Sequence, residues 1–113
     1  MSDTIFARII RREIPATIVY EDDRVLAIND INPQAPVHVL ILPKRHIATL
    51  NDLGPDDDGL MGDVVRRAAI IAAEKGIAAP GYRTLFNTNR DAGQTVFHIH
   101  LHLLGGRTLG PLA

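Results

Sequence analysis

Three histidines, His98, His100 and His102, alternate with apolar residues near the end of the sequence. In a β-strand successive side chains point to opposite faces, so this spacing predicts three imidazoles on one face, with Cα atoms about 6.6 to 6.8 Å apart. The apolar residues between them can bury on the opposite face. Every buried imidazole needs hydrogen-bond partners, so three of them on one face indicate a site for chemistry rather than ordinary packing.

A row of imidazoles suits two kinds of chemistry. A neutral imidazole has a pKa of about 6.5, so near pH 7 one ring nitrogen offers a lone pair that can attack phosphorus. The other nitrogen must then donate to a carbonyl group or to another histidine, and His38, between Val37 and Val39, is the candidate partner. Alternatively, three imidazoles can bind zinc, although the same strand offers no carboxylate to complete such a site.

The composition excludes several other functions. The chain has no cysteine, which excludes disulfides, thiolate zinc sites and cysteine nucleophiles, and Ser2 is its only serine. A net charge of -1 gives no basic surface for nucleic acid. The chain opens with an acidic segment, and no apolar run approaches the roughly 20 residues that a bilayer span needs. We therefore expect a cytoplasmic protein that binds neither nucleic acid nor a membrane.

The elements that position the histidines can be predicted from periodicity. Five β-strands are expected, at residues 17–20, 24–28, 37–42, 82–87 and 95–104. An acidic turn joins the first two strands as a hairpin. The third strand is bounded by Pro36 and Pro43, and its continuous apolar character predicts a central position that is buried on both faces.

Two helices accompany these strands. Residues 2–12 carry apolar side chains at helical spacing, and Ser2 or Asp3 is the expected cap. A second helix begins near Pro55, continues to Lys75, and has aspartates in its first turn, where negative charge suits the helix dipole. The order of elements is not alternating βαβ. It predicts one α+β domain over the whole chain, 1–113, with both helices packed against one sheet.

A longer stretch of the sequence resembles a known family. His98 to Leu104 match the signature of histidine triad proteins, in which three alternating histidines are followed by two apolar residues. Further similar segments lie at residues 4–6, 14–15, 29–38, 43–47, 82–83, 87 and 93–96. Over nearly its whole length the chain is similar to the Hint branch of the histidine triad family.

The resemblance implies a fold, a reaction and partners. Family members have one antiparallel sheet of about five strands with two helices packed against it, continued across a homodimer through the long helix and the strand near Tyr82. The Hint branch hydrolyses the P–N bond of purine nucleoside phosphoramidates, which are AMP or GMP conjugates of amines. The resemblance implies no cofactor and no metal ion.

The resemblance also assigns roles to the four histidines. The middle histidine of the triad, His100, would attack the α-phosphorus, expel the amine and form a nucleotidyl-histidine that water then hydrolyses. His102 would donate a hydrogen bond to a nonbridging phosphate oxygen. His98 and His38 would form a relay that orients and tunes these groups.

Substrate-binding roles follow from the same resemblance. Asp30 would accept hydrogen bonds from the ribose hydroxyls, or it would cap the turn before Asn32. Asn87, Gly93 and Thr95 would contact the phosphate, since glycine permits a close backbone approach. Four apolar residues would form the base pocket, at positions that a helix-on-sheet core would also bury. They are Ile5, Phe6, Ile9 and Ile28.

Alternative functions stay open at this point. The chain could be a nucleotide-binding regulatory or scaffold protein with incidental hydrolysis, or a three-histidine metal enzyme. It could also be a dinucleoside polyphosphate hydrolase, although Phe97 and the segment 105–107 are more similar to the Hint branch. The best-known Hint proteins carry a tryptophan in a longer tail, and this chain has none. We expect His46 to have a solvated surface role.

Overall fold

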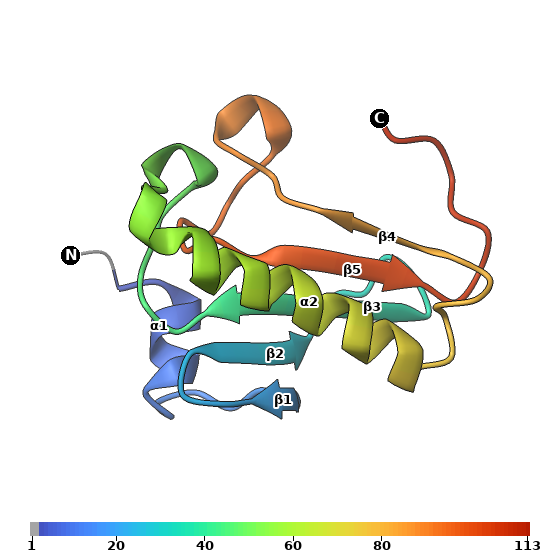
Figure 1. The fold of residues 1–113 in the computed structure, drawn as a ribbon, viewed down its shortest axis with the longest axis horizontal. Coiled ribbons are helices and arrows are strands. Elements are labelled where there is room, and N and C mark those ends of the chain that lie inside the picture. The colour runs from blue at the N-terminus through green and yellow to red at the C-terminus, as the bar shows by residue number, and fades with distance from the viewer. Residues whose placement is uncertain (1–2) are drawn as a thin grey trace.

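The protein is built on a five-stranded antiparallel sheet, and the computed structural model describes residues 3–113 (Figure 1). The strands are β1 (Ile18–Glu21), β2 (Val25–Asn29), β3 (Val37–Pro43), β4 (Tyr82–Leu85) and β5 (Leu101–Gly105). The helices are α1 (Ile5–Ile10) and α2 (Asp58–Glu74), with short 3-10 turns η1 (Leu50–Asp52), η2 (Pro55–Asp57) and η3 (Arg90–Ala92). The strand order is β1-β2-β3-β5-β4, which confirms the predicted α+β fold and the central position of β3.

Side chains of the inner strands divide between two cores. On β3, Val39 and Ile41 pack with the buried residues of α2. The alternate residues Leu40 and Leu42 belong to a second core, with Phe6 of α1. Helix α2 therefore covers one face of the sheet, across the front in Figure 1, and α1 packs against the other. Because α1 is short, part of the second face is left for a site.

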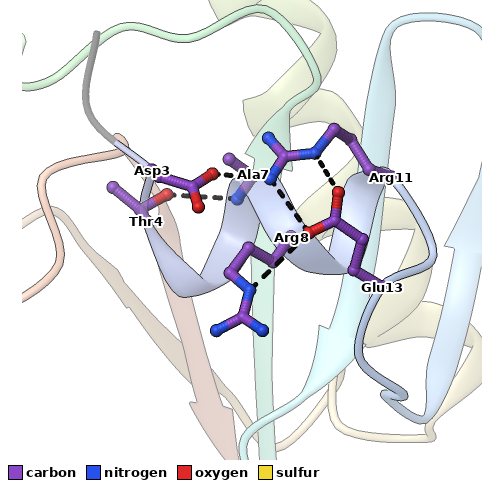
Figure 2. Close-up of polar contacts among 6 residues, drawn as sticks. All are labelled: Asp3, Thr4, Ala7, Arg8, Arg11 and Glu13. Atoms are coloured by element: carbon purple, nitrogen blue, oxygen red, sulfur yellow. Dashed lines mark hydrogen bonds and ion pairs between the residues drawn. The ribbon is translucent and has the colours of Figure 1, made fainter.

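The start of α1 differs from the prediction. Thr4 is the cap: its hydroxyl oxygen accepts a hydrogen bond from the backbone N–H of Ala7 at 3.1 Å (Figure 2). Asp3 was one of the two expected caps, and it lies one residue too early for this geometry. Ser2, the other, lies outside the residues that the structure describes.

The end of α1 is also earlier than predicted, because Arg12 adopts a left-handed backbone conformation with φ 64°. Just before it, the Arg11 guanidinium donates to Asp3 at 2.5 Å and to Glu13 at 2.6 Å (Figure 2). Since these side chains are exposed, the ion pairs contribute little stability. They link the two ends of the helix that carries Phe6.

The last strand begins later than predicted. The expected strand over 95–104 is wrong at its start, since β5 begins at Leu101. The partner strand β3 ends at Pro43, which has no N–H to continue the ladder. The chain before β5 instead bonds to the segment after β3, where the Ile99 N–H donates to the Ile47 carbonyl at 2.7 Å. His98 and His100 therefore precede the regular strand.

The remaining elements lie close to their predicted positions. The strand expected at 82–87 ends at Leu85, and α2 begins at Asp58 after the 3-10 turn that contains Pro55. None of the helices described within residues 3–113 has the length and apolar character to cross a membrane.

The core under α2 predicts the effect of one substitution. Ile71 is fully buried there, so Ile71→Ala should lower the free energy of unfolding by about 2 to 5 kcal/mol. The matched control is Ile31→Ala, whose side chain is 91% exposed and whose loss should cost less than about 0.5 kcal/mol. Urea denaturation measures both. Equal losses would contradict the packing of α2 against the sheet.

Candidate active site

A cavity of about 330 Å³ opens on the face of the sheet where α1 packs. Most of its apolar side chains come from α1, the segment after α1, β2 and β3. Its polar side chains come from the end of β2, the loop after β4 and the chain around the start of β5. All eight residues predicted to bind substrate line it. They are Asp30, Asn87, Gly93, Thr95, Ile5, Phe6, Ile9 and Ile28. Their binding roles stay predictions, but the structure brings them together around one space.

His100 lines the cavity. One of its ring nitrogens is hydrogen-bonded, and the other is free to face the cavity. Its Nδ1 lies 2.8 Å from the backbone carbonyl oxygen of His98, and a carbonyl can only accept, so Nδ1 carries the proton. In the neutral ring, Nε2 then has the lone pair. Burial lowers the pKa of His100, although the His98 carbonyl and Asp30 act in the opposite direction. The ring therefore stays neutral near pH 7.

The tautomer of His102 is determined by two further hydrogen bonds. The backbone N–H of Gln34 lies 3.0 Å from Nδ1 of His38, so this nitrogen accepts and Nε2 of His38 carries the proton. Nε2 of His38 lies 2.9 Å from Nδ1 of His102, which must accept. His102 therefore carries its proton on Nε2, and this N–H is not used in the bond to His38. Burial, with His100 and His38 nearby, lowers the pKa of His102 to about 4.

His98 does not form the expected relay with His38. Its side chain is almost fully buried, and its Nε2 donates to the Pro43 carbonyl at 2.7 Å, while His38 pairs with His102. Nδ1 of His98 has no hydrogen-bond partner among the described residues. Burial lowers the pKa of His98, because a charged ring there would lose its hydration, although the Pro43 carbonyl acts in the opposite direction. His98 reaches the site through its backbone carbonyl instead.

The alternation of faces predicted for the triad is present even before β5. Ile99 and Leu101 both belong to the core under α2, whereas the His98 and His100 rings both lie edge-on to Phe6, with centroid distances of 6.2 and 4.8 Å. Of the three triad histidines, however, only His100 and His102 line the cavity. His98 is instead buried beside Phe6 and is not part of the cavity surface.

Asp30 caps a turn with one carboxylate oxygen, and its ribose-binding role stays a prediction. One carboxylate oxygen accepts from the Asn32 N–H at 2.8 Å, which is the turn-capping role. The other lies 3.4 Å from Nε2 of His38, and the side chain lines the cavity. One oxygen is therefore free of the turn and faces the histidines.

The described residues contain one group able to hold a metal ion. It consists of Asp30, His38 and His102, whose ligand atoms lie within 4.8 Å of one another. His98 and His100 are not in this group, so the three triad histidines do not form a common metal site. In the structure, the two imidazoles of the group are already joined by a direct hydrogen bond.

Several lining residues were not predicted. They are Ile14, Pro15, Ala16, Asn29, Ile31, Leu40, Gln94 and Val96. Leu40 could have been found, since it shares a face of β3 with His38. Gln94 gave no such signal, because its role depends on the loop: its side chain accepts from the Asn89 N–H at 2.8 Å and donates to the Ala48 carbonyl at 2.9 Å.

His46 is exposed, as predicted, but it also has a structural contact. Its Nε2 lies 2.9 Å from the Phe97 carbonyl oxygen, next to the buried His98 ring. Together with the Ile99 to Ile47 hydrogen bond, this contact ties the chain before β5 to the chain after β3.

Comparison with known proteins agrees with this fold. A family model described as HIT domain matches residues 11–109. A purine nucleoside phosphoramidase from Escherichia coli (strain K12) is 56% identical over 110 residues, covering 97% of this chain and 92% of that protein. The chain therefore belongs to the HIT, or histidine triad, family, which confirms the resemblance seen in the sequence.

Solved structures show the same fold. A HIT family hydrolase from Legionella pneumophila Philadelphia 1 is 51% identical, with a TM-score of 0.94 and coverage of 96% of both chains. A zinc-bound histidine triad family protein from Mycobacterium smegmatis is 38% identical, with a TM-score of 0.79, and covers 96% of this chain and 78% of that chain.

The lowered histidine pKa values predict how stability depends on pH. Burial takes the pKa of His102 from 6.5 to about 4, so the unfolded chain binds more protons than the folded one between these values. The free energy of unfolding should therefore fall as the pH drops from 6.5 to about 4. Urea denaturation across this range measures the slope. The His102→Asn variant should show a shallower slope, and an unchanged slope would contradict the assignment.

Proposed function

We propose that the protein hydrolyses the P–N bond of purine nucleoside phosphoramidates through a covalent nucleotidyl-His100 intermediate. The observation that carries this proposal is the pairing of opposite tautomers at the cavity. His100 has a bare Nε2, and its neighbour His102, with a centroid distance of 5.0 Å between the rings, has a protonated Nε2. A nucleophile and a hydrogen-bond donor are therefore available side by side.

The reaction proceeds in two balanced steps. The Nε2 lone pair of His100 attacks the α-phosphorus, and the P–N bond to the amine breaks with its electron pair left on the amine nitrogen, which gains a proton. Water then attacks the same phosphorus, the bond to Nε2 breaks, and the nucleoside monophosphate and free His100 are released. The N–H of His102 stabilises the charge on a nonbridging oxygen in both steps.

The remaining cavity residues provide the binding contacts. Asn87, Gly93 and Thr95 contact the phosphoryl group at the polar end. The free oxygen of Asp30 accepts from the ribose hydroxyls. The apolar end, with Phe6 next to His100, holds the purine base.

The charge of the cavity favours a substrate with a single phosphoryl group. Apart from the neutral His100 and His102, Asp30 is the one ionisable side chain on its lining within residues 3–113, and no lysine or arginine of that stretch lines it. Cationic side chains are what usually bind successive phosphates. A polyphosphate chain would thus enter this cavity without charge compensation, which favours phosphoramidates over dinucleoside polyphosphates.

The assembly and location that we propose are a homodimer in the cytoplasm. Strand β4 is an outer strand of the sheet, and Tyr82 on it is partly exposed. Val65, on the long helix α2, is half exposed. An unpaired edge next to exposed apolar side chains is suited to a second copy.

The net charge of -1 supports the absence of a nucleic-acid partner, and the chemistry requires no cofactor.

Replacement of the nucleophile tests the mechanism directly. His100→Ala should lower kcat for adenosine 5′-phosphoramidate by at least about a thousandfold, because no other bare nitrogen is aligned with His102. The matched His46→Ala variant, whose ring lies off the cavity, should lose less than about tenfold. Alkaline quench and intact-mass spectrometry should detect the nucleotidyl adduct in wild type and not in His100→Ala. Tight AMP binding without any turnover by the wild type would support a scaffold protein instead.

Substrate comparison tests the charge argument. The value of kcat/KM for adenosine 5′-phosphoramidate should exceed that for diadenosine tetraphosphate by at least about tenfold, since the cavity lacks cations for the additional phosphates. Both reactions can be followed by chromatography of released AMP. A preference for the tetraphosphate would refute the phosphoramidase assignment while leaving His100 as nucleophile.

A further inference from the structure

We propose that Arg107, which lies outside the cavity, is a positioning residue that sets the tautomers of His38 and His102. The inference rests on the proposed function, in which the cavity-facing N–H of His102 donates to the phosphoryl group. Arg107 is exposed and does not line the cavity. Its influence must therefore pass through intervening groups, and the structure provides a continuous set of them.

The connection consists of three hydrogen bonds in sequence. Nη2 of Arg107 donates to the Gln34 carbonyl at 2.9 Å, across 73 residues of chain. The N–H of the same Gln34 donates to Nδ1 of His38 at 3.0 Å, and Nε2 of His38 lies 2.9 Å from Nδ1 of His102. One residue, Gln34, thus joins the guanidinium on one side to the buried imidazole on the other.

Gln34 depends on this contact because it lies in an exposed loop. Apart from the bonds to Arg107 and His38, its described polar contact is the one from its own side chain to the Asn32 carbonyl, at 3.1 Å within the same loop. No strand or helix holds its backbone. Among the described bonds of this backbone, the N–H bond reaches His38 only four residues along the chain, and the hydrogen bond from Arg107 is the one that attaches it to a distant segment.

Gly106 brings Arg107 within reach. Its φ is 98°, and a Cβ built on it would lie only 2.9 Å from Cβ of Pro36. Only glycine allows this conformation and this close approach without strain. The chain leaving β5 can consequently lie against the Gln34 loop, and the next residue, Arg107, meets the Gln34 carbonyl.

The consequence for chemistry follows from the donor and acceptor pattern. If the Gln34 N–H moves away, Nδ1 of His38 has lost its donor inside the protein, where its side chain is only 3% exposed to water. The Asp30 carboxylate, 3.4 Å from Nε2 of His38, still favours a proton there, so the proton divides between the two ring nitrogens. In a fraction of the molecules a bare Nε2 of His38 then faces His102. His102 then carries its own proton on Nδ1, so that it can donate to His38. Its cavity-facing Nε2 is left with a lone pair, which repels the phosphoryl oxygen.

The test uses Arg107→Met, which keeps the length of the side chain and removes its donors. It should lower kcat by about three- to tenfold with KM unchanged, as the loss of one hydrogen bond in the connection. Arg107→Lys keeps a donor and should recover part of kcat. The matched control is Arg66→Met on α2, since Arg66 is exposed and has no hydrogen bond or ion pair with any described residue; its kcat should equal that of wild type.

A spectroscopic measurement separates positioning from simple stability. The ¹⁵N resonances of the His38 ring distinguish a protonated from a bare nitrogen, and they should show Nε2–H in wild type and a shift toward Nδ1–H in Arg107→Met. An unchanged His38 tautomer in a folded Arg107→Met variant would overturn the inference. This readout needs no substrate, so it stands even if the phosphoramidase activity itself is not found.

A double-variant comparison gives the second criterion. In a His38→Asn background the connection is already broken, so adding Arg107→Met should cause no further loss of kcat. If Arg107→Met lowers kcat by the same factor in both backgrounds, Arg107 acts by another route and the inference is wrong. Thermal melts of all variants identify any that are unfolded, and Arg107→Lys then serves as the comparison.

Discussion

The chemistry of this site depends on one hydrogen bond, between Nδ1 of His100 and the backbone carbonyl of His98. A neutral imidazole has one proton to place on two nitrogens, and a carbonyl can accept but never donate. The bond therefore decides that the nitrogen facing the cavity is the bare one. Burial removes the competing charged state, because an imidazolium in this position would lose more hydration than its neighbours return.

That carbonyl is held by a segment that belongs to no regular element. The chain before β5 is attached to the end of β3 by a hydrogen bond from the His98 ring to the Pro43 carbonyl. It is attached to the chain after β3 by hydrogen bonds from the Ile99 N–H to the Ile47 carbonyl and from the Gln94 side chain to the Ala48 carbonyl. The first histidine of the triad, His98, thus holds the ring of the second, His100, with its backbone carbonyl. The buried ring of His98 keeps that carbonyl in place by its own hydrogen bond to Pro43. The third histidine receives its tautomer from the opposite direction, through His38 and the Gln34 loop. The two cavity-facing nitrogens differ because two separate backbone groups, one acceptor and one donor, determine them.

Many features of the fold and the site could be predicted from local patterns in the sequence. The continuous apolar run between Pro36 and Pro43 predicted a central strand, and β3 is buried there on both faces. The alternation at the triad placed Ile99 and Leu101 in one core and the histidines on the other side, even where the chain is not a regular strand. The start of β5 was predicted six residues too early, since alternation describes which way side chains point and says nothing about which backbone groups are paired. Likewise, the cap of α1 is Thr4, a choice that depends on one hydroxyl being correctly spaced from the Ala7 N–H.

The fold class and the sheet face that carries the histidines could be predicted from the sequence alone, because both follow from residue type and periodicity. The family could be recognised there too, because the histidine triad and the segments around it resemble known motifs. The contacts between the histidines, in contrast, depend on how the chain folds in three dimensions. Sequence reasoning paired His98 with His38, whereas the fold pairs His38 with His102 and buries His98 against Pro43. The physical reason is that a proton's position on an imidazole depends on the partner within about 3 Å, and those partners are backbone groups brought together from distant parts of the chain. Gln34 and Arg107 are 73 residues apart, and no local pattern in either segment contains the other.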